Sequence, residues 1–176
     1  MDLTQKQLAE LIRGMREAYA RGENAMSFAK KALSSLGADG RNRRLATLVA
    51  YDMQAGSYVD GTRKHPEQKQ RWCRQLAALI KPELPEGGSL LEVGVGEATT
   101  LAGVLRELGE RQAYGFDISW SRISVAYTWL REQSQIAELF VGDLLSIPLT
   151  DNSIDVVYSS HSLEPNGGRE EKALSE

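Results

Sequence analysis

Two glycines separated by a single residue follow a short apolar run near the middle of the chain. Gly94 and Gly96 end the sequence Leu-Leu-Glu-Val-Gly-Val-Gly at residues 90–96. The residues from 98 to 108 then have apolar side chains at helical spacing. A strand, a glycine turn and a helix in this order let backbone N–H groups and the positive end of the helix face a ligand without a bulky side chain between them. A tight turn that binds no ligand remains the alternative.

Acidic residues occur at the expected ends of neighbouring strands. Glu92 lies in the apolar run itself, Asp117 ends a second run, and Asp143 ends a third. A carboxylate about 20 residues beyond the glycine turn can accept two hydrogen bonds from the vicinal hydroxyls of a ribose. A third acid would suit the amino group of an adenine. The acids and the glycine turn together predict a ligand that contains adenosine.

The elements that must position these residues fall into two halves of different character. Helical spacing dominates the first half, and alternating strand and helix patterns dominate the second, which predicts parallel βαβ units. We therefore expect an α/β fold with a doubly wound, mostly parallel sheet and helices on both of its faces. The expected domains are a helical N-terminal lid (1–86) and an α/β core (87–176). The expected helices are 4–21, 23–36, 41–54, 67–81, 98–108 and 120–133, followed by a last helix after Gly167 and Gly168; the expected strands are 89–95, 112–118, 137–142 and 154–159.

The composition of the 176 residues is that of a soluble globular protein, with 41% hydrophobic and 26% charged residues. Residues 1–86 carry 15 Lys and Arg against 10 Asp and Glu, and residues 87–176 carry 6 against 14. Because the charges of the basic half alternate in sign along helices, they indicate solvated faces and not a nucleic-acid surface. No apolar run is long enough to span a membrane, and the first residues lack the apolar core of a signal peptide.

Cys73 is the single cysteine, and the chain has two histidines. One cysteine excludes an internal disulfide, which fits a cytoplasmic location. One cysteine and two histidines are too few for a typical structural zinc site, so we expect no metal. We expect Cys73 to pack in the core and not to act as a nucleophile.

Four motifs in order resemble class I S-adenosylmethionine-dependent methyltransferases. The resemblance covers about residues 88–165 and is carried by residues 92–96 (EVGVG), 115–119 (GFDIS), 142–149 (GDLLSIPL) and 151–157 (DNSIDVV). It implies that the chain binds S-adenosylmethionine and transfers a methyl group. It also implies that Gly94 and Gly96 line the methionine part of the cofactor, that Asp117 holds the ribose hydroxyls, and that Asp143 with Leu144 meets the adenine. The other expected cofactor-binding residues are Glu92, Ile118, Ser159 and Tyr58.

The same resemblance places Ser159, Ser160 and His161 near the sulfonium and the methyl acceptor. His161 would then act as a general base, because an imidazole titrates near neutral pH. Capping or orienting a loop is the alternative for this side chain. Tyr58 follows a helix of the first half and is expected to precede a loop, and in many similar enzymes an aromatic residue from the helical lead-in closes over the cofactor. Packing between helices is the alternative for Tyr58.

The sequence departs from the family pattern in two places. Ala98 stands where the family often has a third glycine, and Thr99 stands where a dinucleotide-binding fingerprint would require one. The family's sheet has seven strands, and this sequence has signals for four. Residues 154–158 would therefore form an exposed apolar edge. We expect a C-terminally truncated chain, or an edge that a second copy covers in a homo-oligomer through a contact over about residues 154–165.

The sequence thus predicts a cytoplasmic S-adenosylmethionine-dependent methyltransferase that acts on a small-molecule acceptor. Neither nucleic acid nor a membrane is an expected partner. Two alternatives stay open. The first is a cofactor-binding module without catalytic activity, and the second is an NAD-binding dehydrogenase domain. The acid pattern and the missing third glycine argue against the dehydrogenase.

Overall fold

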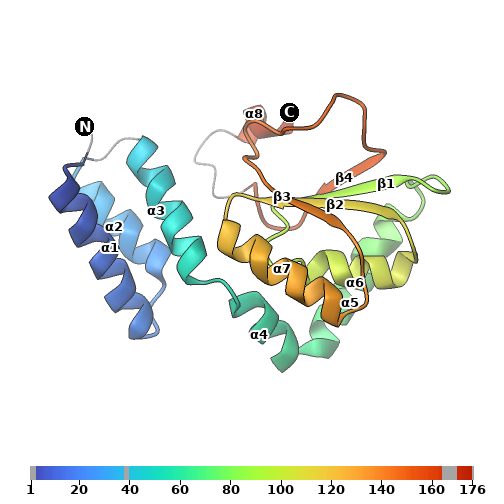
Figure 1. Cartoon of the computed structure of the whole chain (residues 1–176), viewed down its shortest axis with the longest axis horizontal. Helices are drawn as coiled ribbons and strands as arrows, with labels where there is room; N and C mark the ends of the chain where they lie inside the picture. The colour runs from blue at the N-terminus through green and yellow to red at the C-terminus, as the bar shows by residue number, and fades with distance from the viewer. Residues whose placement is uncertain (1–2, 38–39, 164–169, 176) are drawn as a thin grey trace. The chain divides into compact units, whose positions relative to one another are not determined.

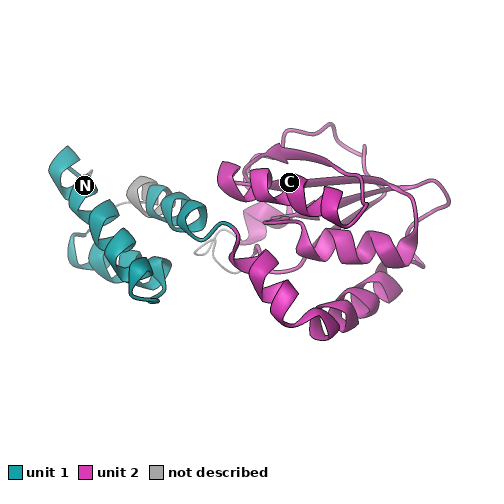
Figure 2. Ribbon diagram, turned by 60° about the horizontal axis from the view of Figure 1, so that its bottom comes forward, with its two compact units in different colours: residues 1–55 teal, residues 56–176 magenta. Residues whose placement is uncertain are grey.

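The computed structural model describes residues 3–37, 40–163 and 170–175. The chain forms two compact units, residues 1–55 and 56–176, which Figure 2 shows in different colours. This division differs from the boundary expected at 86/87. Helix α5 (Pro66–Ile80) belongs to the second unit because its buried residues Cys73, Ala77 and Ile80 share one core with the sheet and its helices. The role of the helical N-terminal part as a lid stays a prediction.

The first unit contains α1 (Gln5–Ala20), α2 (Ala25–Ser35) and α3 (Gly40–Met53), close to the expected helices. Thr4 is the N-cap of α1 and forms a capping box with Gln7, whose side chain accepts from the Thr4 N–H at 2.9 Å. The small core of this unit is formed by Leu11, Met15, Ala25, Ala29, Leu33, Ala46 and Ala50.

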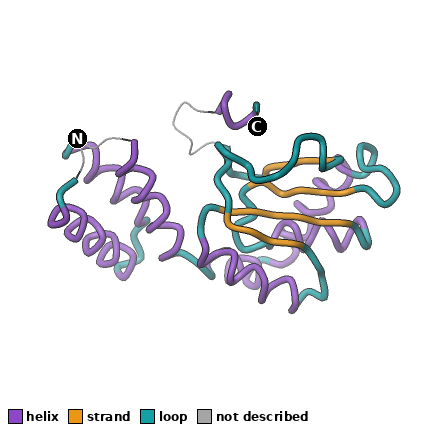
Figure 3. Tube along the Cα trace, turned by 45° about the horizontal axis from the view of Figure 1, so that its top comes forward, coloured by secondary structure: helices purple, strands orange, loops and turns teal. Residues whose placement is uncertain are grey.

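The second unit is built around a parallel sheet with the strand order β3-β2-β1-β4 among the described residues. This confirms the α/β fold class and the position of the last strand at an edge. Figure 3 shows the strands side by side. Their bounds, shorter than expected by one or two residues at some ends, are β1 (Ser89–Val93), β2 (Gln112–Asp117), β3 (Glu138–Val141) and β4 (Val156–Ser159).

Helices α5, α6 (Thr99–Leu108) and α7 (Trp120–Glu132) lie on one face of the sheet (Figure 1). Leu101, Val104 and Leu108 of α6 recur at helical spacing and are buried in the core that also holds Leu90 of β1. We expected helices on both faces. The segment 142–155 between β3 and β4, which contains no helix, instead supplies apolar cover for the second face. A short α8 (Glu170–Leu174) follows; the glycines expected to precede it lie outside the described residues.

Helix α4 (Ser57–Lys64) is the one element of the described part that the sequence did not predict. Its N-terminus is held by Glu97, a fully buried carboxylate from the turn after β1. The two oxygens of Glu97 accept from the N–H groups of Gly56 at 2.9 Å and Val59 at 2.8 Å. These backbone donors have no partner within the helix, so Glu97 satisfies them across the fold. The position of α4 therefore depends on one side chain of the glycine turn.

None of the described helices is long and apolar enough to cross a membrane.

Replacing Glu97 by alanine should destabilise the second unit. The substitution leaves two backbone N–H groups without an acceptor, and each buried unsatisfied donor costs about 1–3 kcal/mol. Glu107 is the matched control, because its carboxylate pairs with Arg74 at the surface at 3.4 Å and such pairs contribute about 0–1 kcal/mol. Urea denaturation of E97A and E107A measures both losses. Equal losses in the two variants would contradict this role of Glu97.

Candidate functional site

The glycine turn follows β1 at the carboxyl edge of the sheet. Gly94 and Gly96 have φ of 69° and 54°, and Ala98 has φ of 55° just before α6. A side chain at Gly94 would meet Ser162, because an added Cβ would lie 2.2 Å from the Cβ of Ser162. An added Cβ at Gly96 would meet nothing nearer than the guanidinium of Arg122 at 3.8 Å. Gly94 is therefore required by packing within the chain, whereas Gly96 leaves space beside its backbone.

Asp117 connects the glycine turn to the end of β2. Its buried carboxylate accepts from the Gly96 N–H at 3.0 Å through one oxygen and from the Ser119 N–H at 2.9 Å through the other. Its carbonyl accepts from the Gly142 N–H at 3.1 Å. These bonds bring the ends of β1, β2 and β3 together around one acid.

Asp143 follows Gly142 and lies half-buried beside this cluster, as the sequence predicts. Its carboxylate accepts from the Leu145 N–H at 3.1 Å and so closes a local turn. Leu144 packs against the apolar cluster around Phe116. Ile118 is half-buried between Asp117 and Ser119. The structure thus gathers the predicted ribose and adenine residues at one edge, while their contacts with a cofactor stay predictions.

Glu92 lies in β1, and its carboxylate is buried and turned toward β4. It accepts from the Tyr158 hydroxyl and from the Ser160 hydroxyl, each at 3.1 Å. Burial raises the pKa of Glu92 from an ordinary 4.5 to about 7. The hydrogen bonds and the positive charge of Lys69 act in the opposite direction. Burial, together with Glu92, also raises the pKa of Tyr158 well above its usual value, so this phenol stays protonated and donates. Direct contact between Glu92 and a cofactor stays a prediction.

The segment after β4 is anchored by serines. Ser162 donates to the Val93 carbonyl at 3.0 Å, and its hydroxyl lies 2.6 Å from that of Ser159. His161 between them is exposed and stacks on Trp72 of α5, with ring centroids 6.3 Å apart. This stacking gives His161 a defined position at the carboxyl edge. Its service as a general base stays a prediction.

Sequence reasoning missed Arg122 and Glu97. Arg122 is a buried cation in the first turn of α7, and its guanidinium carbon lies 4.9 Å from the centroid of the Tyr58 ring. Its guanidinium is also the nearest group to the open side of Gly96. Arg122 and α4 thus bring Tyr58 to the glycine turn. Tyr58 lies in the first turn of α4. The sequence had instead predicted that it precedes a loop. Charged residues beside the motifs were the only available signal for either residue.

No group of three or more His, Cys, Asp or Glu side chains within the described residues could hold a metal ion.

Replacing Glu92 by glutamine should flatten the pH dependence of stability. Because the folded state binds a proton more tightly than the unfolded state, the wild-type free energy of unfolding falls as pH rises between about 4.5 and about 7. The full loss, reached above that window, is on the order of 3 kcal/mol. Glutamine keeps an acceptor for Tyr158 but does not titrate. Urea denaturation of both proteins across this pH range measures the difference. Parallel profiles for the two proteins would contradict the buried, protonated carboxyl.

The sequence of residues 90–176 matches the family described as "Methyltransferase domain". No curated protein matches the chain. Several solved structures resemble it in fold, each with a TM-score of 0.50. The [4+2]-cyclase SpnF shares 24% identity, over 57% of this chain and 38% of that one. A complex of the Trm112 methyltransferase activator from Haloferax volcanii with a protein assigned as a methyltransferase gives 21% identity, over 64% and 48%.

A protein from Bacillus halodurans assigned as a methyltransferase gives 19% identity, over 60% of this chain and 43% of that one. Identities of this size establish a common fold and nothing further. The chain spans less than half the length of each of these structures. That one of them is a cyclase illustrates that a shared fold does not fix the reaction.

Proposed function

We propose that this chain binds S-adenosylmethionine and transfers its methyl group to a small-molecule acceptor, because residues 90–176 match the family described as "Methyltransferase domain". The observation that carries the proposal is the bridge from the Asp117 carboxylate to the N–H groups of Gly96 and Ser119. This bridge places a buried carboxylate beside a glycine that leaves space for a ligand. Such a cradle fits the ribose and the amino-acid part of S-adenosylmethionine.

The residues at this edge have distinct roles in the proposal. Asp117, with Ile118 beside it, would hold the ribose hydroxyls, and Asp143 with Leu144 would meet the adenine. Glu92 would act through the position of Ser160, to which it is bonded.

When bound, S-adenosylmethionine supplies an electrophilic methyl group on a sulfonium. The protein's part is to hold the acceptor in line with it, which is chiefly a matter of positioning. His161 would accept the proton that the acceptor loses, at a ring nitrogen of an imidazole held against Trp72. Tyr58, beside Arg122, would cover the cofactor.

Replacing Gly96 by alanine should weaken S-adenosylmethionine binding by at least about tenfold, or about 1.4 kcal/mol. The added methyl group would occupy the space beside the turn. Gly87 is the matched control, because it also has a positive φ, 72°, and an added Cβ there would meet nothing within 4 Å. Both variants carry a backbone strain of about 1–2 kcal/mol, so they should lose similar stability. Calorimetric titration with S-adenosylmethionine, S-adenosylhomocysteine and NAD gives the affinities.

Equal affinities in G96A and the wild type would contradict the proposed cradle. Binding of NAD in preference to S-adenosylmethionine would instead favour the dehydrogenase alternative. Binding without methyl transfer to any of a panel of small-molecule hydroxyls and amines would favour the non-catalytic alternative.

The edge strand β4 supports a second proposal, that two copies of the chain associate through it. Within the described residues β4 pairs only with β1, and Val157 is 55% exposed. An unpaired strand edge with exposed apolar side chains invites pairing with another chain. The contact was expected over 154–165, of which 164 and 165 lie outside the described residues.

Replacing Val157 by lysine should shift the chain toward monomers, since a charged side chain on an edge strand opposes pairing. Val141 provides the control, because it is similarly exposed, at 47%, on the opposite edge strand β3. Sedimentation at several concentrations should show dimers for the wild type and V141K and fewer for V157K. A wild-type protein that stays monomeric throughout would refute association through β4.

A further inference from the structure

A second cavity lies in the helix layer of the second unit, on the opposite side of α6 from the sheet. It has a volume of about 230 Å³ and is lined by residues of α4, α5, α6 and α7. Thr99, Gly103 and Arg106 line it from one face of α6, whereas Leu101 and Val104 on the other face are buried in the core. Neither the glycines of the turn nor the acids at the strand ends line this cavity. We call it the helix-layer pocket.

The charge of the helix-layer pocket is one-sided. Its lining includes Arg63, Lys69 and Arg106 and no Asp or Glu. Arg63 is neutralised by an ion pair with Glu132 at 2.8 Å. Lys69 and Arg106 form no ion pair within the described residues.

The polar partners of these two cations are uncharged. Lys69 donates to the Thr100 hydroxyl at 2.7 Å, and Arg106 donates to the side-chain amide of Gln133. The pocket therefore holds two cations without an ion-pair partner among the described residues, although the nearby carboxyl group of Glu92 attracts the charge of Lys69.

Lys69 is half-buried, and this burial is unfavourable for its charge. Burial lowers the pKa of the Lys69 ammonium and raises that of the neighbouring Cys73 thiol. A charge removed from water is costly unless an opposite charge or several hydrogen bonds compensate for it. An anion in the pocket would supply that compensation. A phosphate or carboxylate oxygen would suit both the compact ammonium of Lys69 and the planar guanidinium of Arg106.

The remaining lining combines uncharged polar side chains with an apolar part that includes Cys73, Ala102 and Trp129. A Cβ added to Gly103 would lie 2.4 Å from the Cys73 sulfur, so the two helices approach closely there. The Trp129 ring forms part of the wall, and the guanidinium carbon of Arg63 lies over it, 5.7 Å from the ring centroid. Because the volume is below the roughly 300–1,000 Å³ of pockets for drug-sized ligands, the ligand must be small.

We propose that the helix-layer pocket binds a small organic oxyanion, whose phosphate or carboxylate group contacts Lys69 and Arg106 and whose apolar part lies against Cys73 and Trp129. The proposal is independent of the proposed methyl transfer, because the pocket shares no residue with the cradle around Gly96 and Asp117. It assigns the chain a second ligand site in the helix layer.

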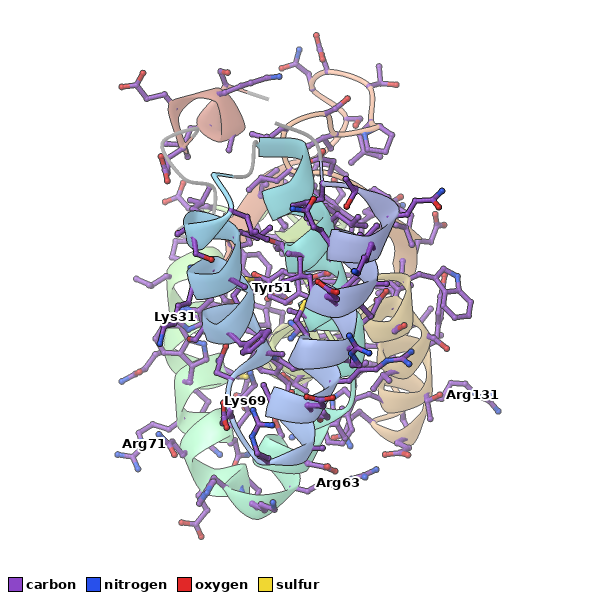
Figure 4. The ribbon with its side chains drawn as sticks, turned by 90° about the vertical axis from the view of Figure 1, so that its left-hand side faces the viewer. Lys31, Tyr51, Arg63, Lys69, Arg71 and Arg131 are labelled. Atoms are coloured by element: carbon purple, nitrogen blue, oxygen red, sulfur yellow. The ribbon has the colours of Figure 1, made fainter. Side chains whose placement is uncertain are left out.

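The test compares the anion affinities of the wild type, K69M, R106M and R71M. Arg71 is the matched control: it lies on α5 two residues from Lys69, does not line the pocket and points outward (Figure 4). Inorganic phosphate, phenyl phosphate and benzoate are titrated by calorimetry at constant ionic strength with chloride as the background anion. The difference in affinity between phenyl phosphate and inorganic phosphate measures the contribution of the apolar wall. The difference in affinity between benzoate and phenyl phosphate shows whether the site prefers a carboxylate or a phosphate.

The expected result is saturable binding of phenyl phosphate or benzoate by the wild type and R71M, with affinities within about twofold of each other. K69M and R106M should each bind at least about tenfold more weakly. K69M removes a half-buried charge together with its attraction to Glu92, and R106M, at an exposed position, provides a second measurement if K69M does not fold. Equal affinities in the wild type and K69M or R106M, or no saturable binding of any probe by the wild type, would overturn the proposal.

Discussion

The carboxylate of Asp117 is the constraint on which the edge of the sheet depends. Parallel strands deliver their carboxyl ends to one edge, but they do not fix the loops that follow. Asp117 fixes two of these loops by accepting from Gly96 and Ser119, and its carbonyl holds a third through Gly142. Three sequence-distant segments therefore share one anchor, and the space beside Gly96 keeps its shape because that anchor is buried.

Glu92, Glu97 and Asp117 are buried acids near this edge, and they accept hydrogen bonds from different kinds of donor. Asp117 and Glu97 each accept from two backbone N–H groups. Glu92 accepts from the hydroxyl groups of Tyr158 and Ser160, and burial raises its pKa to about 7. Backbone N–H groups that donate to a carboxylate favour its charged form. The hydroxyl partners do not offset burial for Glu92, so its charge state responds to pH near neutrality while it joins β1 to β4.

The parallel sheet, the edge position of β4 and the gathering of Asp117 and Asp143 could be predicted, because short apolar runs separated by helical spacing specify a parallel sheet. Helix α4 could not, since Ser57–Lys64 has Gly61 in its middle and one buried residue, Val59. Its stability comes from Glu97, a contact across about 40 residues of sequence that no local pattern encodes. The requirement for glycine at position 94 as a consequence of packing could not be predicted either, because the approach of Ser162 is a tertiary contact.

Helix α6 separates two environments that the chain keeps distinct. Its N-terminal turn adjoins the glycine turn, where Glu97 holds α4 and Arg122 approaches Gly96. Its outer face meets Lys69, which donates to Thr100 within the first turn of the same helix. A change in the partner of Lys69 would therefore act on residues that directly follow the turn. Cys73 packs against Gly103 without room for a methyl group, so α5 and α6 are closely packed directly beside these residues.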